Sequence, residues 1–463
     1  MRVAFAIVLM GGLASAAPVD PNSAPSRLIG AAIGGENAYA IAQSLSDGVG
    51  QRIAGSAQSE KAIAWAEAEM KSLGLERVHR EAVKVPHWVR GAESLEVVSP
   101  EFMVGRALHV AALGGSIGTS PDGLSGEIVE VDSFDALKAL GDAVRGKIVF
   151  FNKAMQRTQD FVGYGSVVGL RGHGAVAAAK QGAIGAIIRS VGTAGNQLVH
   201  TGATRYDDGV EKIPFAAVSL EDADLLHRLL SRSSAVKIKL TLGAKFLPEV
   251  DSFSVVGEVR GSERPNEIVL IGAHLDSWDL GAGAIDDAAG CGIVLETARM
   301  LAHLKPRLRR TLRVVLYQNE EYGLSGARAY ALAHQSELAA HVAAIEADSG
   351  AGRALGYGVV GDAKSVELMK KLTAPMAGLH LLPVRMADEM GADLIPLQER
   401  GVPILGVDQD VSRYFDWHHT AADTMDKIDP LEIAQATAAF AGLTWSIADS
   451  IERLPASKPA PKW

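Results

Sequence analysis

The second half of the chain alternates short apolar runs with amphipathic stretches. The apolar runs at 267–273, 311–318 and 342–346 are short and rich in β-branched residues, which predicts buried strands. The stretches at 288–303 and 325–334 have helical periodicity and predict helices. Strands that alternate with helices predict a mostly parallel mixed sheet with helices on both faces, which is an α/β fold.

The alternation continues to the C-terminus, where a strand is predicted at 402–407 and a closing helix at 433–451. Near the N-terminus, residues 36–73 have mainly helical character. We therefore expect one α/β domain that begins with residues 25–99 and resumes with residues 249–455.

Residues 100–248 differ from the sequence on either side. Short runs at 127–131, 147–151 and 185–189 predict strands, and residues 175–181 predict a short helix. Metal-ligand residue types do not cluster in this stretch. It is expected to be an inserted β-rich domain with some helix.

The N-terminus has the pattern of a secretory signal peptide over residues 1–16. Arg2 supplies a positive charge, residues 3–10 are apolar, and Ala14-Ser15-Ala16 provides a small-residue cleavage site. The mature protein is therefore expected to be secreted or periplasmic. No later stretch reaches the roughly 18 apolar residues of a transmembrane helix, so no membrane span is expected.

Composition narrows the class of protein. Of 463 residues, 48% are hydrophobic and 21% are charged, as in globular proteins with a substantial core. The net charge is -9 and no lysine and arginine cluster stands out, so a nucleic-acid partner is not expected. Cys291 is the single cysteine, which excludes an internal disulfide, and we expect it to be buried.

Residues of the metal-ligand type follow the predicted strands. In open α/β sheets, ligands bind beyond the carboxyl ends of strands. Two histidines and three carboxylates, one of them bridging, are the set that a pair of zinc ions needs. Each residue alone has an ordinary structural explanation, but their joint occurrence predicts a two-zinc site. In chain order, the candidates are His274, Asp286, Glu321, Asp348 and His419.

Three further carboxylates have predicted roles beside these ligands. Glu320 is a free carboxylate that can act as the general base of hydrolysis. Asp276 comes two residues after His274 and can orient its ring. Asp423 can do the same near His419.

These motifs carry a resemblance to a known family. Residues 251–450 resemble the co-catalytic zinc exopeptidases of the aminopeptidase Y type, and look most like the carboxypeptidase Q subgroup. The matching motifs are His274-Leu-Asp-Ser-Trp-Asp279, Gly283-Ala-Ile-Asp286-Asp287, Asn319-Glu-Glu-Tyr-Gly-Leu-Ser-Gly326, Glu346-Ala-Asp348-Ser-Gly350 and Tyr414-Phe-Asp-Trp-His-His-Thr-Ala-Ala-Asp-Thr424. Upstream, Gly50-Gln-Arg-Ile-Ala-Gly-Ser56 and Val85-Pro-His-Trp-Val-Arg-Gly91 also look like that subgroup.

The resemblance implies a role for each candidate. It implies one zinc ion on His274, Asp286 and Asp348, and a second on Asp286, Glu321 and His419. Glu320 becomes the general base. His418 stands where many relatives have a tyrosine that stabilises the oxyanion, a role that an imidazole N–H could take.

At the level of the fold, the resemblance implies a zinc-exopeptidase fold of the phosphorylase/hydrolase-like type. Residues 100–248 resemble a protease-associated domain inserted into it. A homodimer is also implied.

Several functions remain open from the sequence. The first is a secreted two-zinc exopeptidase for dipeptides or short peptides, and a close alternative is an aminopeptidase that trims longer peptides. A non-catalytic binding protein on a peptidase scaffold and a single-zinc cyclotransferase or amide hydrolase fit less well, because the complete ligand set and Glu320 are present. Candidates for binding the charged ends of a substrate, each with an alternative as an ordinary salt-bridge residue, are Arg52, Asp279, Asp388 and Asp393.

Overall fold

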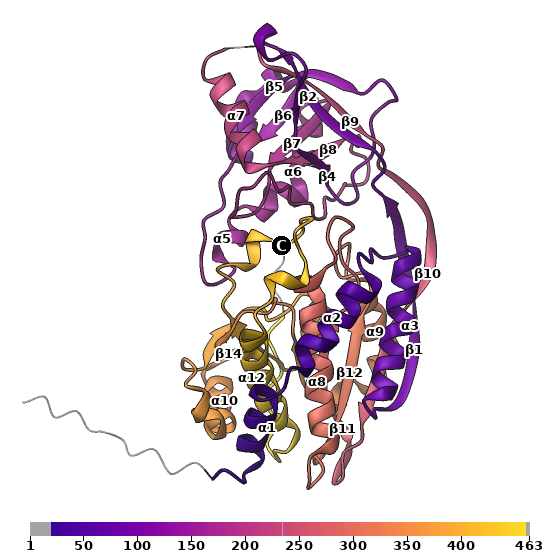
Figure 1. Cartoon of the computed structure of the whole chain (residues 1–463), viewed down its shortest axis with the longest axis vertical. Helices are drawn as coiled ribbons and strands as arrows, with labels where there is room; N and C mark the ends of the chain where they lie inside the picture. The colour runs from indigo at the N-terminus through magenta and orange to yellow at the C-terminus, as the bar shows by residue number, and fades with distance from the viewer. Residues whose placement is uncertain (1–19, 234, 460–463) are drawn as a thin grey trace, which may run out of the picture.

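The computed structural model describes residues 20–233 and 235–459. They form two α/β units stacked along the long axis (Figure 1). We call the unit that contains β1 and residues from β10 onward the first layer, and the unit from β2 to β9 the second layer. Each layer is built on an eight-stranded sheet within these described residues. The predicted signal peptide, residues 1–16, lies outside them. Within the same ranges, no helix has the length and apolarity needed to cross a membrane.

The first sheet has the strand order β1-β10-β12-β11-β13-β16-β14-β15. The four central strands, from β12 to β16 in that order, are parallel, and antiparallel pairs flank them. The sheet is therefore mixed: its four central strands are parallel, β10 and β14 pair with them in antiparallel fashion, and the edge strand β15 pairs in parallel with β14. The strand bounds are β1 Glu76–Val89, β10 Lys245–Val259, β11 Arg264–His274, β12 Arg310–Tyr317, β13 His341–Glu346, β14 Ala354–Val360, β15 Arg385–Ala387 and β16 Ile404–Gln409.

Helices cover both faces of the first sheet, as predicted. Successive residues of β11 point to opposite faces of the sheet, and each face packs against helices in its own hydrophobic core. Ile271 lies in the first core and Leu270 in the second. Helices α1, α2, α3, α8, α10 and α12 contribute to the first core, and α9 and α11 to the second. Figure 1 shows α2 and α8 in front of the sheet. The helix bounds are α1 Ala24–Ile33, α2 Asn37–Val49, α3 Ala57–Ser72, α8 Ala289–His303, α9 Ser325–Ala333, α10 Ala363–Thr373, α11 Ile395–Gln398 and α12 Pro430–Ala448.

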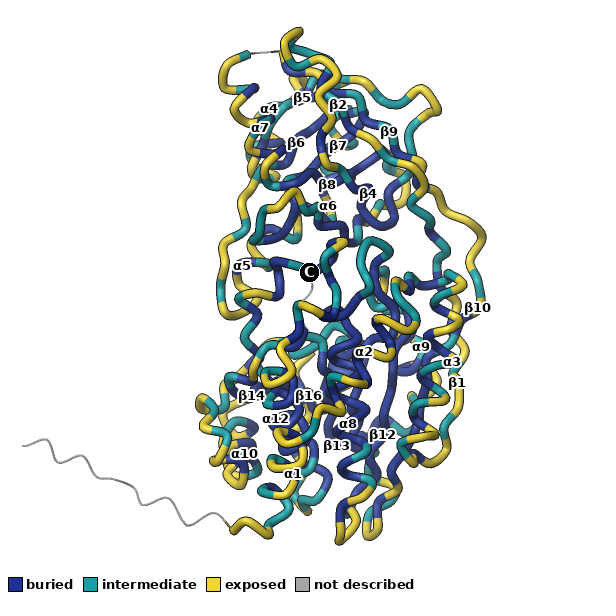
Figure 2. The backbone as a smooth tube through the Cα atoms, in the orientation of Figure 1, coloured by how far each residue is buried: buried dark blue, intermediate teal, exposed yellow. Residues whose placement is uncertain are grey.

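The second sheet has the order β3-β2-β9-β5-β6-β7-β8-β4, with β5 to β8 parallel. Helix α7 packs on one face, and α4 and α6 pack on the other. Figure 2 shows buried strands at the centre of both layers. The bounds are β2 Glu93–Ser99, β3 Arg106–Leu108, β4 Val110–Ala112, β5 Leu124–Val131, β6 Ile148–Phe151, β7 Gly185–Arg189, β8 Phe215–Val218, β9 Lys237–Leu242, α4 Phe134–Leu140, α5 Val162–Gly165, α6 Val168–Lys180 and α7 Leu220–Leu230.

The predicted α/β class is confirmed, with two differences in detail. The middle of the chain forms a layer with helices on both sides of its sheet, so it is itself α/β and more than a β-rich insertion. Its sheet also includes β2, which precedes residue 100. The long antiparallel strands β1 and β10 run side by side and lead the chain into and out of this layer.

Candidate metal centre and active site

The predicted ligands come together at the carboxyl ends of the central parallel strands. His274 is the last residue of β11, and Glu320-Glu321 and Asp348 follow β12 and β13 closely. Asp286 lies in the turn before α8. A side chain at Gly290, in the first turn of α8, would meet the carbonyl oxygen of Ala347 at 1.9 Å, so glycine lets this helix approach β13.

One group forms around His274. Its Nε2 lies 3.0 Å from Asp286 Oδ1 and 3.6 Å from Asp348 Oδ1. Its Nδ1–H donates to the carbonyl oxygen of Asp276 at 3.0 Å. A ring that donates from Nδ1 presents Nε2 to a metal, as zinc ligands require.

A second group forms around His419. Its Nε2 lies 3.1 Å from Asp286 Oδ2 and 3.0 Å from Glu321 Oε2. Asp286 therefore directs one oxygen toward each histidine. The other four predicted ligands thus gather around the Asp286 carboxylate: His274 and His419 contact it directly, and Asp348 and Glu321 contact these histidines.

The donor set fits metal ions. The Asp286 Oδ2 and Glu321 Oε1 atoms are buried and have no hydrogen-bond partner. A buried carboxylate oxygen without a partner carries a desolvation cost that a bound cation removes. Imidazole nitrogens combined with carboxylate oxygens are ligands typical of zinc.

Two neighbouring residues also come within reach of the cluster. Asp287 lies near His274 and Asp348. Its two oxygens, however, accept the backbone N–H groups of His274 and Gly290, at 3.1 and 2.9 Å. Both oxygens of Asp287 are therefore occupied by backbone hydrogen bonds. The geometry favours Asp286 over Asp287 as the candidate ligand.

His418 is the other neighbour. Its ring stacks on the ring of His419 with centroids 3.5 Å apart, and its Nε2 lies 3.5 Å from Asp286 Oδ2. Glu321 pairs with His419 and with no other histidine among the described residues. His419 thus faces two carboxylates, those of Asp286 and Glu321, whereas His418 approaches only that of Asp286.

Glu320 is held by Asp276 in a way that the sequence did not predict. The Asp276 carboxylate was expected to orient His274, but it lies 3.8 Å from His274 Nδ1 and accepts the backbone N–H of Glu320 at 3.0 Å. The backbone carbonyl of Asp276 orients the ring instead. Asp423, predicted to support His419, accepts the backbone N–H of Ile285 at 2.7 Å.

The charges of the site are strongly coupled. Burial disfavours the charged form of His274, but Asp286 and Asp348 outweigh it and raise the His274 pKa well above its ordinary value. Burial also disfavours the Asp286 anion, yet His274 and His419 hold its pKa well below the ordinary value. Burial, reinforced by Asp348 and Glu321, raises the pKa of Glu320 well above its ordinary value. Cations bound here would oppose that last effect.

The candidates for binding substrate ends have different surroundings. Arg52 is fully buried, and its guanidinium donates to the carbonyl oxygens of Leu275, Ala282 and Gly283. It therefore holds the loop behind His274 and is shielded from a substrate. Asp279 forms a two-pronged ion pair with Arg90.

The other two acidic candidates also differ. Asp388 is exposed. Asp393 is fully buried beside Glu346, and neither of its carboxylate oxygens has a hydrogen-bond partner.

Cys291, the single cysteine, is fully buried, as expected, in the first turn of α8. Its thiol donates to the carbonyl oxygen of His274 at 3.2 Å. Burial raises the pKa of this thiol. The thiol therefore supports the end of the strand that carries His274.

The second layer contributes side chains that sequence reasoning missed. Arg171 of α6 lies 3.5 Å from His419 Nδ1 and donates to the Tyr164 hydroxyl at 2.7 Å. His200 and Thr201, in the loop after β7, contact the backbone of His418 and His419. These residues are not clustered in the sequence, so no local pattern marks them.

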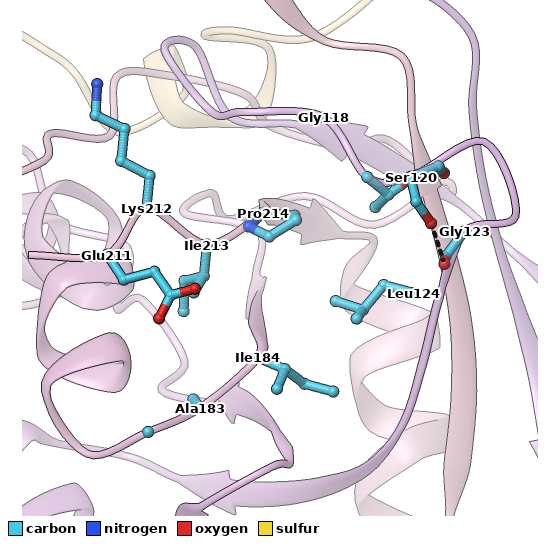
Figure 3. Close-up of a pocket in the computed structure, with 12 residues that line it drawn as sticks. Gly118, Ser120, Gly123, Leu124, Ala183, Ile184, Glu211, Lys212, Ile213 and Pro214 are labelled. Atoms are coloured by element: carbon cyan, nitrogen blue, oxygen red, sulfur yellow. Dashed lines mark hydrogen bonds between the residues drawn. The ribbon is translucent and has the colours of Figure 1, made fainter.

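A separate cavity of about 380 Å³ lies in the second layer (Figure 3). Leu124, Ile184 and Pro214 line it, at the amino ends of β5, β7 and β8. The loop that reaches His419 leaves the opposite end of β7. The cavity therefore shares no residue with the metal centre.

Comparison with known proteins shows the family of this chain. Residues 254–444 match peptidase family M28. Carboxypeptidase Q from Mus musculus is 39% identical over 413 residues, which covers 89% of this chain and 86% of the relative. This chain belongs to peptidase family M28. Human carboxypeptidase Q is 38% identical and is covered to 85% of its length.

Solved structures show how far the M28 architecture extends. The crystal structure of a peptidase M28 precursor from Shewanella amazonensis is 42% identical, with a TM-score of 0.90, and the match covers 94% of this chain and 98% of that one. A zinc aminopeptidase from Bacillus subtilis shares the fold at 20% identity, with a TM-score of 0.64 and coverage of 91% and 97%. Both layers therefore belong to the architecture that these proteins share.

These matches confirm two predictions: the peptidase family and the similarity to carboxypeptidase Q. The chain is a metallopeptidase of the exopeptidase kind, and its substrates are peptides.

Proposed function

We propose that this M28 peptidase hydrolyses dipeptides or short peptides with two zinc ions. One ion would be held by His274, Asp286 and Asp348. The other would be held by Asp286, Glu321 and His419. The observation that supports this most is the Asp286 carboxylate, whose oxygens lie 3.0 and 3.1 Å from the two histidines.

The proposed chemistry is hydrolysis of a peptide bond. When bound, the zinc pair supplies an acidified water and polarises the scissile carbonyl. Glu320 accepts the proton of the attacking water and later gives it to the leaving amine. Asp276 keeps Glu320 in position through the backbone N–H of that residue.

His418 is proposed to donate an N–H to the developing oxyanion. Burial and the neighbouring charge of His419 hold the pKa of His418 well below its ordinary value, so its ring is neutral at physiological pH. A neutral ring has one N–H. On Nε2, this N–H would point toward the Asp286 side of the site. Such a donor stabilises charge that forms only in the transition state.

The proposed preference for dipeptides is based on the similarity to carboxypeptidase Q over most of the chain. Trimming of longer peptides from the N-terminus is the second candidate. Two relatives whose names include aminopeptidase are 28% and 30% identical to this chain, over 239 and 162 residues. We further propose, from the sequence alone, export through the predicted signal peptide and assembly as a homodimer.

A substrate panel tests the proposal. Free dipeptides, dipeptides blocked at either end and longer peptides would be assayed with and without a chelator, and with zinc added back. We expect free dipeptides to be cleaved, activity to disappear with the chelator and zinc to restore it. Efficient cleavage of peptides with blocked C-termini would favour the aminopeptidase, and activity unaffected by chelation would refute the zinc mechanism.

A further inference from the structure

We infer that His200 and Thr201, which belong to the second layer, are positioning residues for the zinc site built on Glu321 and His419. The inference rests on the proposed two-zinc function and extends it. It assigns the loop after β7 a specific task, which is to fix the orientation of His419. The site built on His274 and Asp348 would not depend on this loop.

Thr201 and His419 pair through two contacts in opposite directions. The backbone N–H of Thr201 donates to the carbonyl oxygen of His419 at 3.0 Å. The Thr201 carbonyl oxygen lies 3.3 Å from His419 Nδ1. Because Nδ1–H donates to this carbonyl, the lone pair of Nε2 is left for a metal ion. One residue of the second layer thus fixes both the backbone and the ring of the ligand.

The backbone at His419 needs such support. Its φ is 63°, in the left-handed region that residues other than glycine rarely adopt. A residue in this conformation persists only where its surroundings hold it there. The contacts with Thr201 are part of those surroundings.

His200 fixes the adjoining peptide. Its Nδ1–H donates to the carbonyl oxygen of His418 at 2.7 Å, and its ring is fully buried. A side chain at Gly192 would meet this ring at 2.2 Å, so the ring fills the space that this glycine leaves. The backbone N–H of His200 donates to the Ser190 hydroxyl at 3.0 Å. The donor therefore has little freedom to turn away.

The other zinc site has an independent support. His274 Nδ1–H donates to the carbonyl oxygen of Asp276, two residues along the same chain segment. The partners of Asp348 and His274 all come from the first layer. Disturbing His200 should therefore weaken one of the two zinc sites and spare the other.

Three variants of the full chain test this inference. His200→Leu removes the N–H donor, whereas His200→Asn keeps an N–H near the position of Nδ1. His341→Leu is the matched control, because His341 is also buried and its Nδ1 contacts a backbone carbonyl oxygen, that of Glu337, at 3.2 Å. Each protein is equilibrated at a series of buffered free zinc concentrations, and bound zinc per chain is measured by mass spectrometry.

We expect the wild type to bind two ions. In His200→Leu, one ion should bind with wild-type affinity and the other about 10- to 100-fold more weakly, as for other lost orienting partners. His200→Asn should recover most of the second affinity. His341→Leu should bind two ions normally, even if its thermal stability falls.

The outcomes distinguish a failure of this inference from a failure of the proposed two-zinc function. Equal zinc binding by His200→Leu and the wild type would overturn the inference, as would equal weakening of both ions. A wild type that never binds two ions would overturn the proposed function. If His200→Leu does not fold, Ser190→Ala loosens His200 more gently and should weaken the same single ion, and unchanged binding there would also overturn the inference.

Discussion

Asp276 serves two groups of the site with two different atoms. Its backbone carbonyl oxygen accepts the His274 ring N–H, and its carboxylate accepts the backbone N–H of Glu320. The proposed ligand His274 and the proposed general base Glu320 are thereby fixed to one another through a single residue. Because the two tasks use separate atoms, a substitution of the side chain should affect only one of them.

Asp276→Ala tests that separation. The variant loses the acceptor for Glu320 and keeps the carbonyl that orients His274. We expect kcat to fall about 10- to 100-fold, the usual effect of losing an orienting partner, while two zinc ions remain bound. Steady-state kinetics and zinc analysis measure the two effects, and loss of zinc in this variant would contradict the division of tasks.

Glu320→Gln tests the general base itself. The amide keeps the size of the side chain but cannot accept a proton. We expect kcat to fall by about two to four orders of magnitude, the usual contribution of such a group, with zinc content unchanged. A variant that retains wild-type turnover would remove Glu320 from the mechanism.

Among the elements, the end of α9 carries a group that should make stability depend on pH. His334 lies between Glu81 of β1, at 2.8 Å, and Glu337. Burial disfavours its charged form, but the two carboxylates outweigh this and raise the pKa of His334. The interaction ties α9 to β1, one of the two strands that lead to the second layer.

The sign of the pH effect follows from the raised pKa. A histidine whose pKa is higher in the folded state stabilises that state fully below its unfolded pKa of about 6.5, and less as pH rises through the folded value. His334→Gln should therefore lower the free energy of unfolding by about 1 kcal/mol or less at pH 5.5, since the pair is partly exposed. Denaturant unfolding at several pH values should show the difference shrinking toward pH 9, and a constant difference would contradict the assignment.

The elements that the sequence predicted share a physical property. Strands β11, β12 and β13 are buried on both faces over most of their length, so each contains an apolar run, although Arg313 interrupts the one in β12. Strand β1 was missed because most of its residues are at least partly exposed and many are charged. Strand β14 was missed because Gly356 and Gly358 interrupt it.

The cluster of candidate metal ligands could be predicted because each member follows a recognisable strand or motif. The supports of His419 could not, since Thr201 lies 218 residues away in the chain. Only the packing of the two layers brings these residues together, and no local pattern records it.

In the whole molecule, the two layers meet around the metal centre. Arg90, just after β1, pairs with Asp279 of the first layer, and Arg157 of the middle segment pairs with Asp416. Together with the Thr201 contacts, these interactions place the His419 loop between the layers. Zinc on His419 would therefore hold together a region to which both layers contribute.

Removal of zinc should consequently destabilise the protein. A ligand that binds only the folded state adds about 2.7 kcal/mol per site at 100 times its Kd. Without the ions, the buried carboxylates around Asp286 also lose their counter-charge. Thermal unfolding should occur at a lower temperature after dialysis against a chelator and recover with added zinc, and an unchanged midpoint would contradict binding at this site.

The buried Cys291 thiol makes this protein convenient for labelling. Because it is sealed under the strand that carries His274 and its pKa is raised, maleimides and similar reagents should leave it untouched in the folded state. A cysteine introduced on the surface of each layer would then react alone, with no background to remove. Pairs of fluorophores or spin labels attached there could report the separation of the layers as zinc enters and leaves.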